Sequence, residues 1–136
     1  MLFAVLGKAT KDTEAGVLPT TEALEEMLAF SEGLARDGML VAAHGLMASS
    51  KGARVRFDGD GWTVTDGPFA ETKELVAGFM ILRAKSLEEI VERVKTGPKI
   101  PGSEMEIRPI FGADDFGDAA TPELRERKAA ITEART

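Results

Sequence analysis

The chain of 136 residues has the length of one ordinary domain. Apolar residues make up 43% of it, which is close to the usual globular value, so a packed core is expected. A net charge of −6, without any long Lys/Arg cluster, argues against a surface that binds nucleic acid. The lack of cysteine excludes disulfides, thiolate nucleophiles and Cys-ligated zinc.

The N-terminal sequence MLFAVLGKAT lacks the basic segment that begins a signal peptide. Its apolar run is also too short to span a bilayer. We therefore expect a cytoplasmic protein that has no membrane partner.

The first third of the chain predicts a strand, a loop and a helix. Met1–Leu6 is continuously apolar, as in a strand buried on both faces. Residues 8–19 are predicted to form a polar loop. Thr20 or Thr21 can cap the helix, and Asp37-Gly38 can end it. The apolar stripe of this helix is formed by Leu24, Met27, Leu28 and Leu34.

Residues 39–43 predict a second apolar strand, and a β-hairpin follows it. Val55 and Phe57 alternate with arginines, and Trp62 and Val64 alternate with threonines. The residues between them, DGDG, tolerate the positive φ values that a tight turn needs. They lack the twelfth-position glutamate of a calcium-binding loop, so the hairpin interpretation is preferred.

The segment TDGPFAETKE, residues 65–74, must turn the chain, because Pro68 removes a backbone donor and Gly67 disfavours a regular strand. Residues 76–82 predict the next strand. Ser86 and Glu89 have the spacing of a capping box at the start of an amphipathic helix. Gly97-Pro98 ends that helix, and residues 104–108 alternate as a half-exposed strand does.

Residues 111–136 differ in composition and predict a tail with a short helix after Thr121-Pro122. Few apolar residues are present there, so the helix would be marginal in isolation. We expect it to dock on residues 1–110 or on a neighbouring subunit, with Phe111 and Phe116 as anchors.

These elements predict an α+β fold. Without the hairpin their order is βαββαβ, the ferredoxin-like arrangement, in which helices cover one face of a sheet. The strands are rich in Val, Phe, Ile and Met, so the other face would expose a large apolar patch. Pairing two sheets would cover it, and a homodimer is predicted.

The TDGPFAETKE segment, the GMLVAAHGL strand and the EIRPIFGADDFGDAATPELRE ending resemble the DGPF-domain branch of the YCII-related (YciI-like) family. The resemblance covers nearly the whole chain. It implies a ferredoxin-like subunit that dimerises into an α+β barrel, and relatives encoded near, or fused to, extracytoplasmic-function sigma factors. Some YciI-like proteins are thought to use a His–Asp pair. The corresponding positions here are Met27 and the region of Thr96-Gly97, so no such pair is carried over.

The polar loop between two strands is the candidate site. Asp66 is either a turn former or a carboxylate at the rim of a cleft. Asp66 and Glu71 could converge across the turn and act as an acid and a base, whereas Lys73 would keep both ionised. We name Asp66 and His44 as catalytic candidates, and Glu71 and Lys73 as ligand-binding candidates.

His44 is the only histidine, and it is either a structural group at a strand end or a base. One chain therefore cannot build a metal site from several histidines, and no metal or cofactor is predicted. The alternatives are a site that combines His44 with Asp66 or Glu71, and a second histidine supplied by a dimer partner. Ser49 and Ser50 lack the pattern of a nucleophilic serine.

Two functions fit these observations. The first is a small dimeric protein that has a ligand-binding or catalytic cleft near the DGPF loop and a small-molecule ligand. The second is a non-enzymatic regulatory or interaction protein associated with an extracytoplasmic-function sigma factor. The sequence does not decide whether the protein is an enzyme.

Overall fold

The structure, a computed structural model, describes residues 1–134, apart from the side chains of residues 73, 133 and 134. It has a mixed α+β fold with antiparallel sheets. The strands are β1 (Leu2–Lys8), β2 (Leu40–Gly45), β3 (Ala53–Phe57), β4 (Trp62–Asp66), β5 (Val76–Arg83) and β6 (Met105–Pro109). The helices are α1 (Lys11–Glu14), α2 (Thr21–Arg36), α3 (Leu87–Val94) and α4 (Pro122–Ala134), with 3-10 turns η1 (Ser49–Lys51), η2 (Thr72–Glu74) and η3 (Ala113–Ala119).

The main sheet has four strands in the order β2-β5-β1-β6, and every neighbouring pair is antiparallel. The two central strands, β1 and β5, are apolar along most of their length, as strands flanked on both sides usually are. Helix α2 lies between β1 and β2, and helix α3 lies between β5 and β6. In each case the two strands that the helix connects are not neighbours in the sheet. This element order is the one that the sequence predicts.

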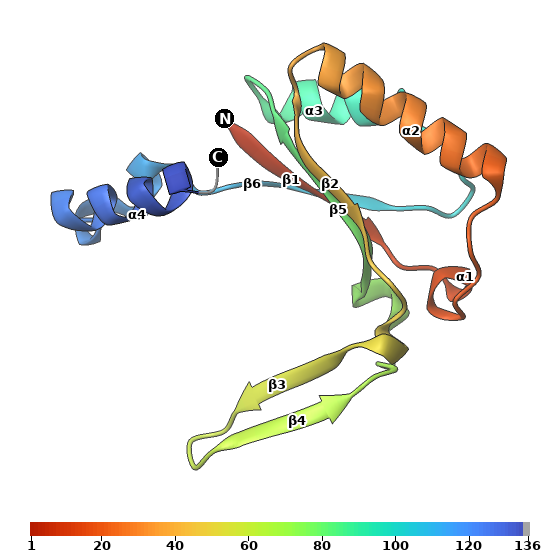
Figure 1. Cartoon of the computed structure of the whole chain (residues 1–136), viewed down its shortest axis with the longest axis horizontal. Coiled ribbons are helices and arrows are strands. Elements are labelled where there is room, and N and C mark those ends of the chain that lie inside the picture. The colour runs from red at the N-terminus through yellow and green to blue at the C-terminus, as the bar shows by residue number, and fades with distance from the viewer. Residues whose placement is uncertain (135–136) are drawn as a thin grey trace.

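Helices α2 and α3 both cover one face of this sheet (Figure 1). Leu34 of α2 and Ile90 of α3 are completely buried, and both belong to the cluster that contains Phe3 of β1 and Leu82 of β5. The core therefore lies between the helices and one face of the sheet, because these apolar side chains leave water together there.

The caps predicted from the sequence are present, with one difference. Thr20 accepts the N–H of Ala23, and Ser86 accepts the N–H of Glu89. The Glu89 carboxylate accepts the N–H of Lys85 at 3.0 Å, one residue before the expected partner. The prediction of a polar loop over residues 8–19 is also wrong in part, because α1 forms a single helical turn there, capped by Thr10.

The hairpin β3–β4 forms a two-stranded sheet of its own, separate from the main sheet. Its register places Val55 opposite Val64 and Phe57 opposite Trp62. Figure 1 shows that the hairpin projects from the body on the side away from α2 and α3. The alternation in the sequence predicted the hairpin itself but not the direction in which it points.

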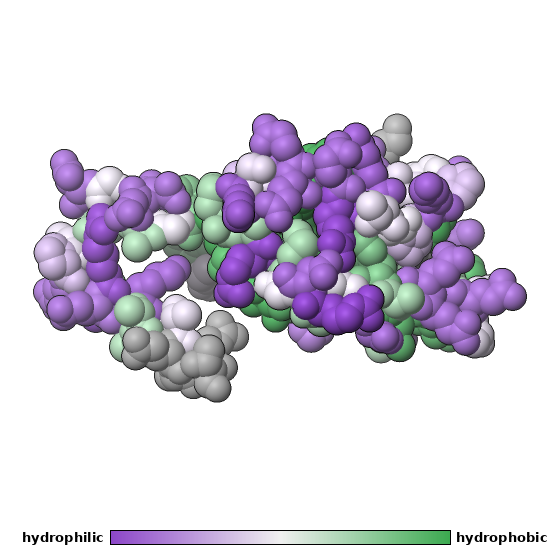
Figure 2. All heavy atoms as spheres, turned by 90° about the horizontal axis from the view of Figure 1, so that it is seen from above, coloured by the Kyte–Doolittle hydropathy of each residue, from purple (hydrophilic) through white to green (hydrophobic). Residues whose placement is uncertain are grey.

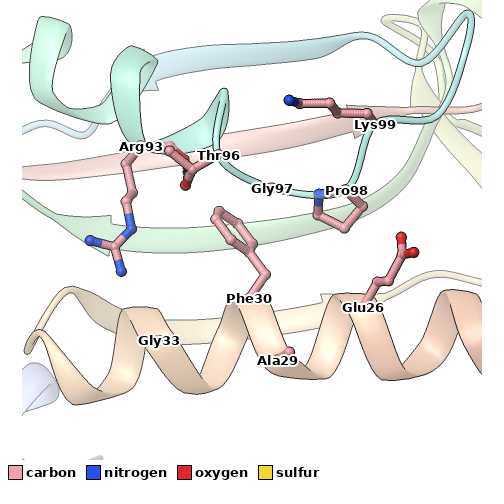
Figure 3. Close-up of a pocket in the computed structure, with 9 residues that line it drawn as sticks. All are labelled: Glu26, Ala29, Phe30, Gly33, Arg93, Thr96, Gly97, Pro98 and Lys99. Atoms are coloured by element: carbon pink, nitrogen blue, oxygen red, sulfur yellow. Dashed lines mark hydrogen bonds between the residues drawn. The ribbon is translucent and has the colours of Figure 1, made fainter.

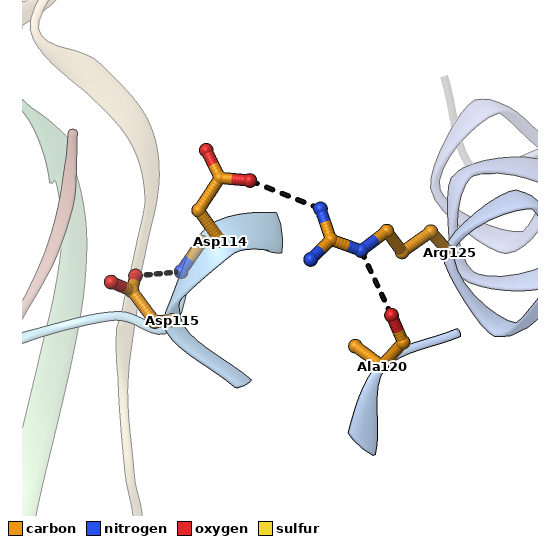
Figure 4. A network of polar contacts seen from close by, with 5 residues as sticks. Asp114, Asp115, Ala120 and Arg125 are labelled. Atoms are coloured by element: carbon orange, nitrogen blue, oxygen red, sulfur yellow. Dashed lines mark hydrogen bonds and ion pairs between the residues drawn. The ribbon is translucent and has the colours of Figure 1, made fainter. Parts of the chain in front are cut away.

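The tail that follows β6 is a small folded unit, held by its own contacts. The rings of Phe111 and Phe116 stack with centroids 4.7 Å apart. Arg125 of α4 donates to the carboxylate of Asp114 and to the carbonyl of Ala120 (Figure 4). Figure 2, which looks down on the helices, shows the tail as a lobe set off from the body. Its docking on a partner stays a prediction.

Among the helices in the described part of the chain, none is both long enough and apolar enough to cross a bilayer.

Candidate functional site

The turn at residues 66–69 is packed tightly against the 3-10 turn η1. Gly67 precedes Pro68 through a cis peptide bond, and its N–H donates to the carbonyl of Gly52 at 3.0 Å. A Cβ atom at position 67 would lie 1.7 Å from the carbonyl oxygen of Ser49. No side chain fits in that space, so the close approach of the two backbones requires glycine here.

Ser49 connects this turn to helix α1. Its hydroxyl accepts the N–H of Phe69 at 3.0 Å and donates to one oxygen of the Glu14 carboxylate. The other oxygen of Glu14 accepts the N–H of Ser49 at 3.0 Å. Three segments that are far apart in the sequence are therefore joined by one half-buried set of hydrogen bonds. We call Glu14, Ser49 and the Phe69 N–H the latch.

The latch alters the acidity of its carboxyl group. The hydrogen bond from the Ser49 hydroxyl, helped by the one from the Ser49 N–H, lowers the pKa of Glu14 below its ordinary value. Glu14 is therefore ionised at neutral pH, and a carboxylate of lowered pKa is a weak base. The Ser49 proton is already donated to this carboxylate. The arrangement is suited to holding the turn in place and not to activating a nucleophile.

The face of the main sheet opposite α2 and α3, which we call the open face, has an apolar centre. Phe3 and Val5 of β1 are buried in the core, so Leu6 and its alternate neighbours lie on the open face. Residues directly opposite in antiparallel pairs share a face, which extends this surface to β5. All of its central side chains are half-buried in the single chain, and they belong to Ala4, Leu6, Phe79 and Ile81.

Ionisable groups flank this apolar centre. His44 of β2 is opposite Phe79, and the two rings lie 5.7 Å apart. On the opposite side of the apolar centre, Lys8 Nζ of β1 lies 3.1 Å from the Glu106 carboxylate of β6. Arg108 of β6 is opposite Ala4 and therefore lies on the same face, where it is exposed. His44 and Glu106 lie in one row across the sheet, three strand spacings or roughly 14 Å apart.

Of the four residues that the sequence predicts as a site, three have side chains that the structure describes, and all three are exposed. His44 is exposed on β2, Asp66 is exposed at the end of β4, and Glu71 is exposed just before η2. Among the hydrogen bonds and ion pairs of the described residues, none involves the side chain of Asp66 or Glu71. The side chain of Lys73 lies outside the described part of the chain. The described residues contain no group of three His, Cys, Asp or Glu side chains that could hold a metal.

A separate hollow of about 700 Å³ lies between α2 and the end of α3 (Figure 3). Phe30 forms its floor against Gly97, and Arg93 lies at one end of it. Arg93 is also paired with Asp37 at 2.6 Å, so its charge is already balanced within the chain. Thr96 lines the hollow and donates its hydroxyl to the carbonyl of Arg93. Glu26 and Lys99 also line the hollow, but its lining residues include no histidine and no aspartate, so no His–Asp pair lies near Thr96-Gly97.

The model of the YCII-related domain matches residues 1–114. The chain belongs to the YCII-related family. One solved structure that aligns with it is 5-chloro-2-hydroxyhydroquinone dehydrochlorinase (TftG) from Burkholderia phenoliruptrix AC1100, in complex with 2,5-dihydroxybenzoquinone. The alignment covers 82% of this chain and 96% of that one, with 18% identity and a TM-score of 0.43, which is too distant to carry an argument about function. No curated protein matches the sequence.

The latch of this YCII-related chain has no counterpart among the predictions from the sequence. They place Glu14 in a polar loop, and they assess Ser49 only as a nucleophile. The one available signal was Gly67, since a glycine beside a proline in a turn often marks a close backbone approach. That signal shows that something lies near position 67, but it does not say which segment.

Replacing Ser49 by alanine should destabilise the fold by about 1–2 kcal/mol, because the Phe69 N–H loses its acceptor and the Glu14 carboxylate loses one of its two hydrogen bonds. Urea denaturation measures this loss. Ser50→Ala is the matched control, since Ser50 is the exposed neighbour. Equal stability of the two variants would show that the latch contributes nothing.

The stability of the protein should also depend on pH through Glu14. Because its pKa in the folded chain is lowered, its contribution is fully present above the ordinary value of 4.5 and is lost as the pH falls below it. Glu14→Gln should therefore lose most stability relative to wild type near neutral pH, and the difference should shrink at acidic pH. Urea midpoints measured between pH 7 and pH 3 test this, and a constant difference would contradict it.

Proposed function

We propose that this chain is the ferredoxin-like subunit of a homodimer in the DGPF branch of the family. Two open faces meet in it as an α+β barrel, and they enclose a ligand-binding or catalytic cleft beside the DGPF loop. The observation that carries the proposal is the open face itself. Its apolar centre is half-buried in a single chain, and ionisable side chains lie at both of its edges.

The chemistry of this face favours a particular class of ligand. A small-molecule site is usually apolar with a few polar groups that fix orientation. Phe79 and Leu6 supply the apolar surface, and Arg108 supplies a cation that can bind a carboxylate through two hydrogen bonds. Lys8 is less available, because Glu106 already pairs with it. A small, partly apolar carboxylic acid therefore fits best.

The residues predicted from the sequence have defined roles in this proposal. His44 lies beside Phe79 at the edge of the proposed cleft, where its imidazole can act as a base or as a hydrogen-bond donor. Asp66, Glu71 and Lys73 belong to the loop at the end of the cleft, where they would contact the polar part of a ligand. The tight turn at Gly67 and the latch hold that loop in a defined position.

A non-enzymatic regulatory protein is the second candidate, associated with an extracytoplasmic-function sigma factor. The tail is the observation that favours it. Phe111, Leu124 and Ile131 are at least 46% exposed there, and the same segment carries charged side chains such as Asp115 and Arg127. Such a lobe is suited to protein contacts. Its failure to bind a purified sigma factor of the same host would argue against this role. A cytoplasmic location stays a prediction under either function.

A charge placed in the apolar centre should separate the subunits. Wild type is expected to be a dimer by light scattering at micromolar concentration, and Ile81→Glu is expected to be a folded monomer, because dimerisation would remove the new carboxylate from water within an apolar contact. Leu18→Glu is the control, since Leu18 is 83% exposed in a loop. Circular dichroism checks folding, and a monomeric wild type would refute the dimer.

Ligand binding is tested with benzoate and phenylacetate by isothermal titration. Both should bind the wild type, and Arg108→Ala should weaken binding about tenfold, because the charge-assisted hydrogen bonds to the carboxylate are lost. His44→Ala should weaken it less. Arg127→Ala, in the tail, is the control and should bind as wild type does. If neither acid binds, the proposed ligand class is wrong.

A further inference from the structure

The β3–β4 hairpin has one apolar face and one polar face. Cross-strand pairing places Val55 beside Val64 and Phe57 beside Trp62 on the same side, and the two aromatic rings lie 5.1 Å apart. The apolar side chains are all exposed, by 59% for Phe57 and by 70% for Trp62. The opposite side carries Arg54, Arg56, Thr63 and Thr65.

Within one chain this apolar face has no cover. A two-stranded hairpin alone is at best marginally stable in water. At its base the hairpin is attached to the body: Gly67 bonds to Gly52, and the Arg54 guanidinium lies 3.9 Å from the centre of the Phe69 ring. Both contacts lie where the hairpin joins the body. The other end of the hairpin, which carries Phe57 and Trp62 beside the turn, projects away from the body (Figure 1).

We propose that the apolar face of this hairpin packs against a second copy of the chain, beside the open face of that copy. Each hairpin is then an arm that covers its partner and brings Trp62 to the edge of the partner's cleft. This inference rests on the proposed dimer and adds to it a residue that one subunit contributes to the site of the other.

Two observations favour a second copy over another occupant. First, the arm and the open face both lie away from α2 and α3 (Figure 1), and the apolar side chains are exposed on the arm and half-buried on the open face. A two-fold axis pairs each surface with its counterpart, so one association event covers both. Second, β4 continues directly into the turn at Gly67, which makes the arm continuous with the loop that borders the cleft.

The size of the surface also fits. Two aromatic and two valine side chains that are mostly exposed present on the order of 400 Å² on one arm. With two arms and the surfaces they cover, the contact comes to roughly 1,600 Å², the size of a standard stable interface. A single arm on an unrelated partner would provide only half of that area.

Trp62 itself provides the first test, because it is the only tryptophan of the chain. In the dimer its fluorescence should be blue-shifted and protected from iodide. Dilution through the dissociation constant should shift the emission to the red and remove the protection, in parallel with the loss of dimer by light scattering. Emission that stays red-shifted in the dimer would overturn the inference, and this measurement needs no substitution.

The second test compares two adjacent positions on opposite faces of the arm. Val64→Glu should raise the dissociation constant of the dimer at least tenfold, because it places a carboxylate in the covered face. Thr63→Glu makes the same change of charge on the other face, opposite Arg56, and should change it less than threefold. Equal effects of the two substitutions would overturn the inference.

Failure of the arm and failure of the proposed dimer give different results. If Ile81→Glu is monomeric while Val64→Glu dimerises as wild type does, the open faces form the dimer and the arm takes no part. If Val64→Glu is monomeric while Ile81→Glu still dimerises, the arm contacts a second copy, but the open-face cleft is wrong, and with it the position of Trp62 beside that cleft. A wild type that is monomeric at all concentrations overturns both.

Discussion

The sheet is apolar on both faces, but the helices cover only one of them, and the rest of the molecule follows from this imbalance. Leu34 and Ile90 lie over Phe3 and Leu82 and form the core on the helix side. On the other side, the row that contains Leu6 and Phe79 remains half-exposed. Burial of apolar area is the main favourable term in folding, so an uncovered face of this kind represents stabilisation that a single chain does not obtain.

The elements that depend on local chemistry were predictable from the sequence. The alternation of apolar and polar residues predicts the hairpin, and the apolar runs predict the central strands. The capping residues Thr20 and Ser86 predict where α2 and α3 begin. The element order followed, because strands and helices that alternate in this way have few arrangements that bury their apolar faces. The membership of the YCII-related family was predictable as well, since the ten residues from Thr65 to Glu74 form a specific segment.

The candidate site was predictable only in part, because its contacts join residues that are far apart in the sequence. His44 and Asp66 could be named as single residues, but the row that joins His44 to Glu106 depends on strand register. The latch depends on the place where α1 ends relative to η1, a distance of 35 residues along the chain. No local pattern marks Glu14 and Ser49 as partners, whereas Gly67 carries a signal because its backbone alone tolerates the approach of another segment.

The cation–π contact between Arg54 and Phe69 has a consequence for regulation. It joins the base of the arm to the turn beside the proposed cleft, so a displacement of either one changes the environment of the other. Because the partner's arm completes the proposed cleft, a ligand would bind the dimer more tightly than the single chain. Association of two chains and occupation of the cleft would then strengthen each other by the same factor. In such a protein the ligand affinity rises with the concentration of the protein itself, so the cell could adjust the response by setting the level of expression.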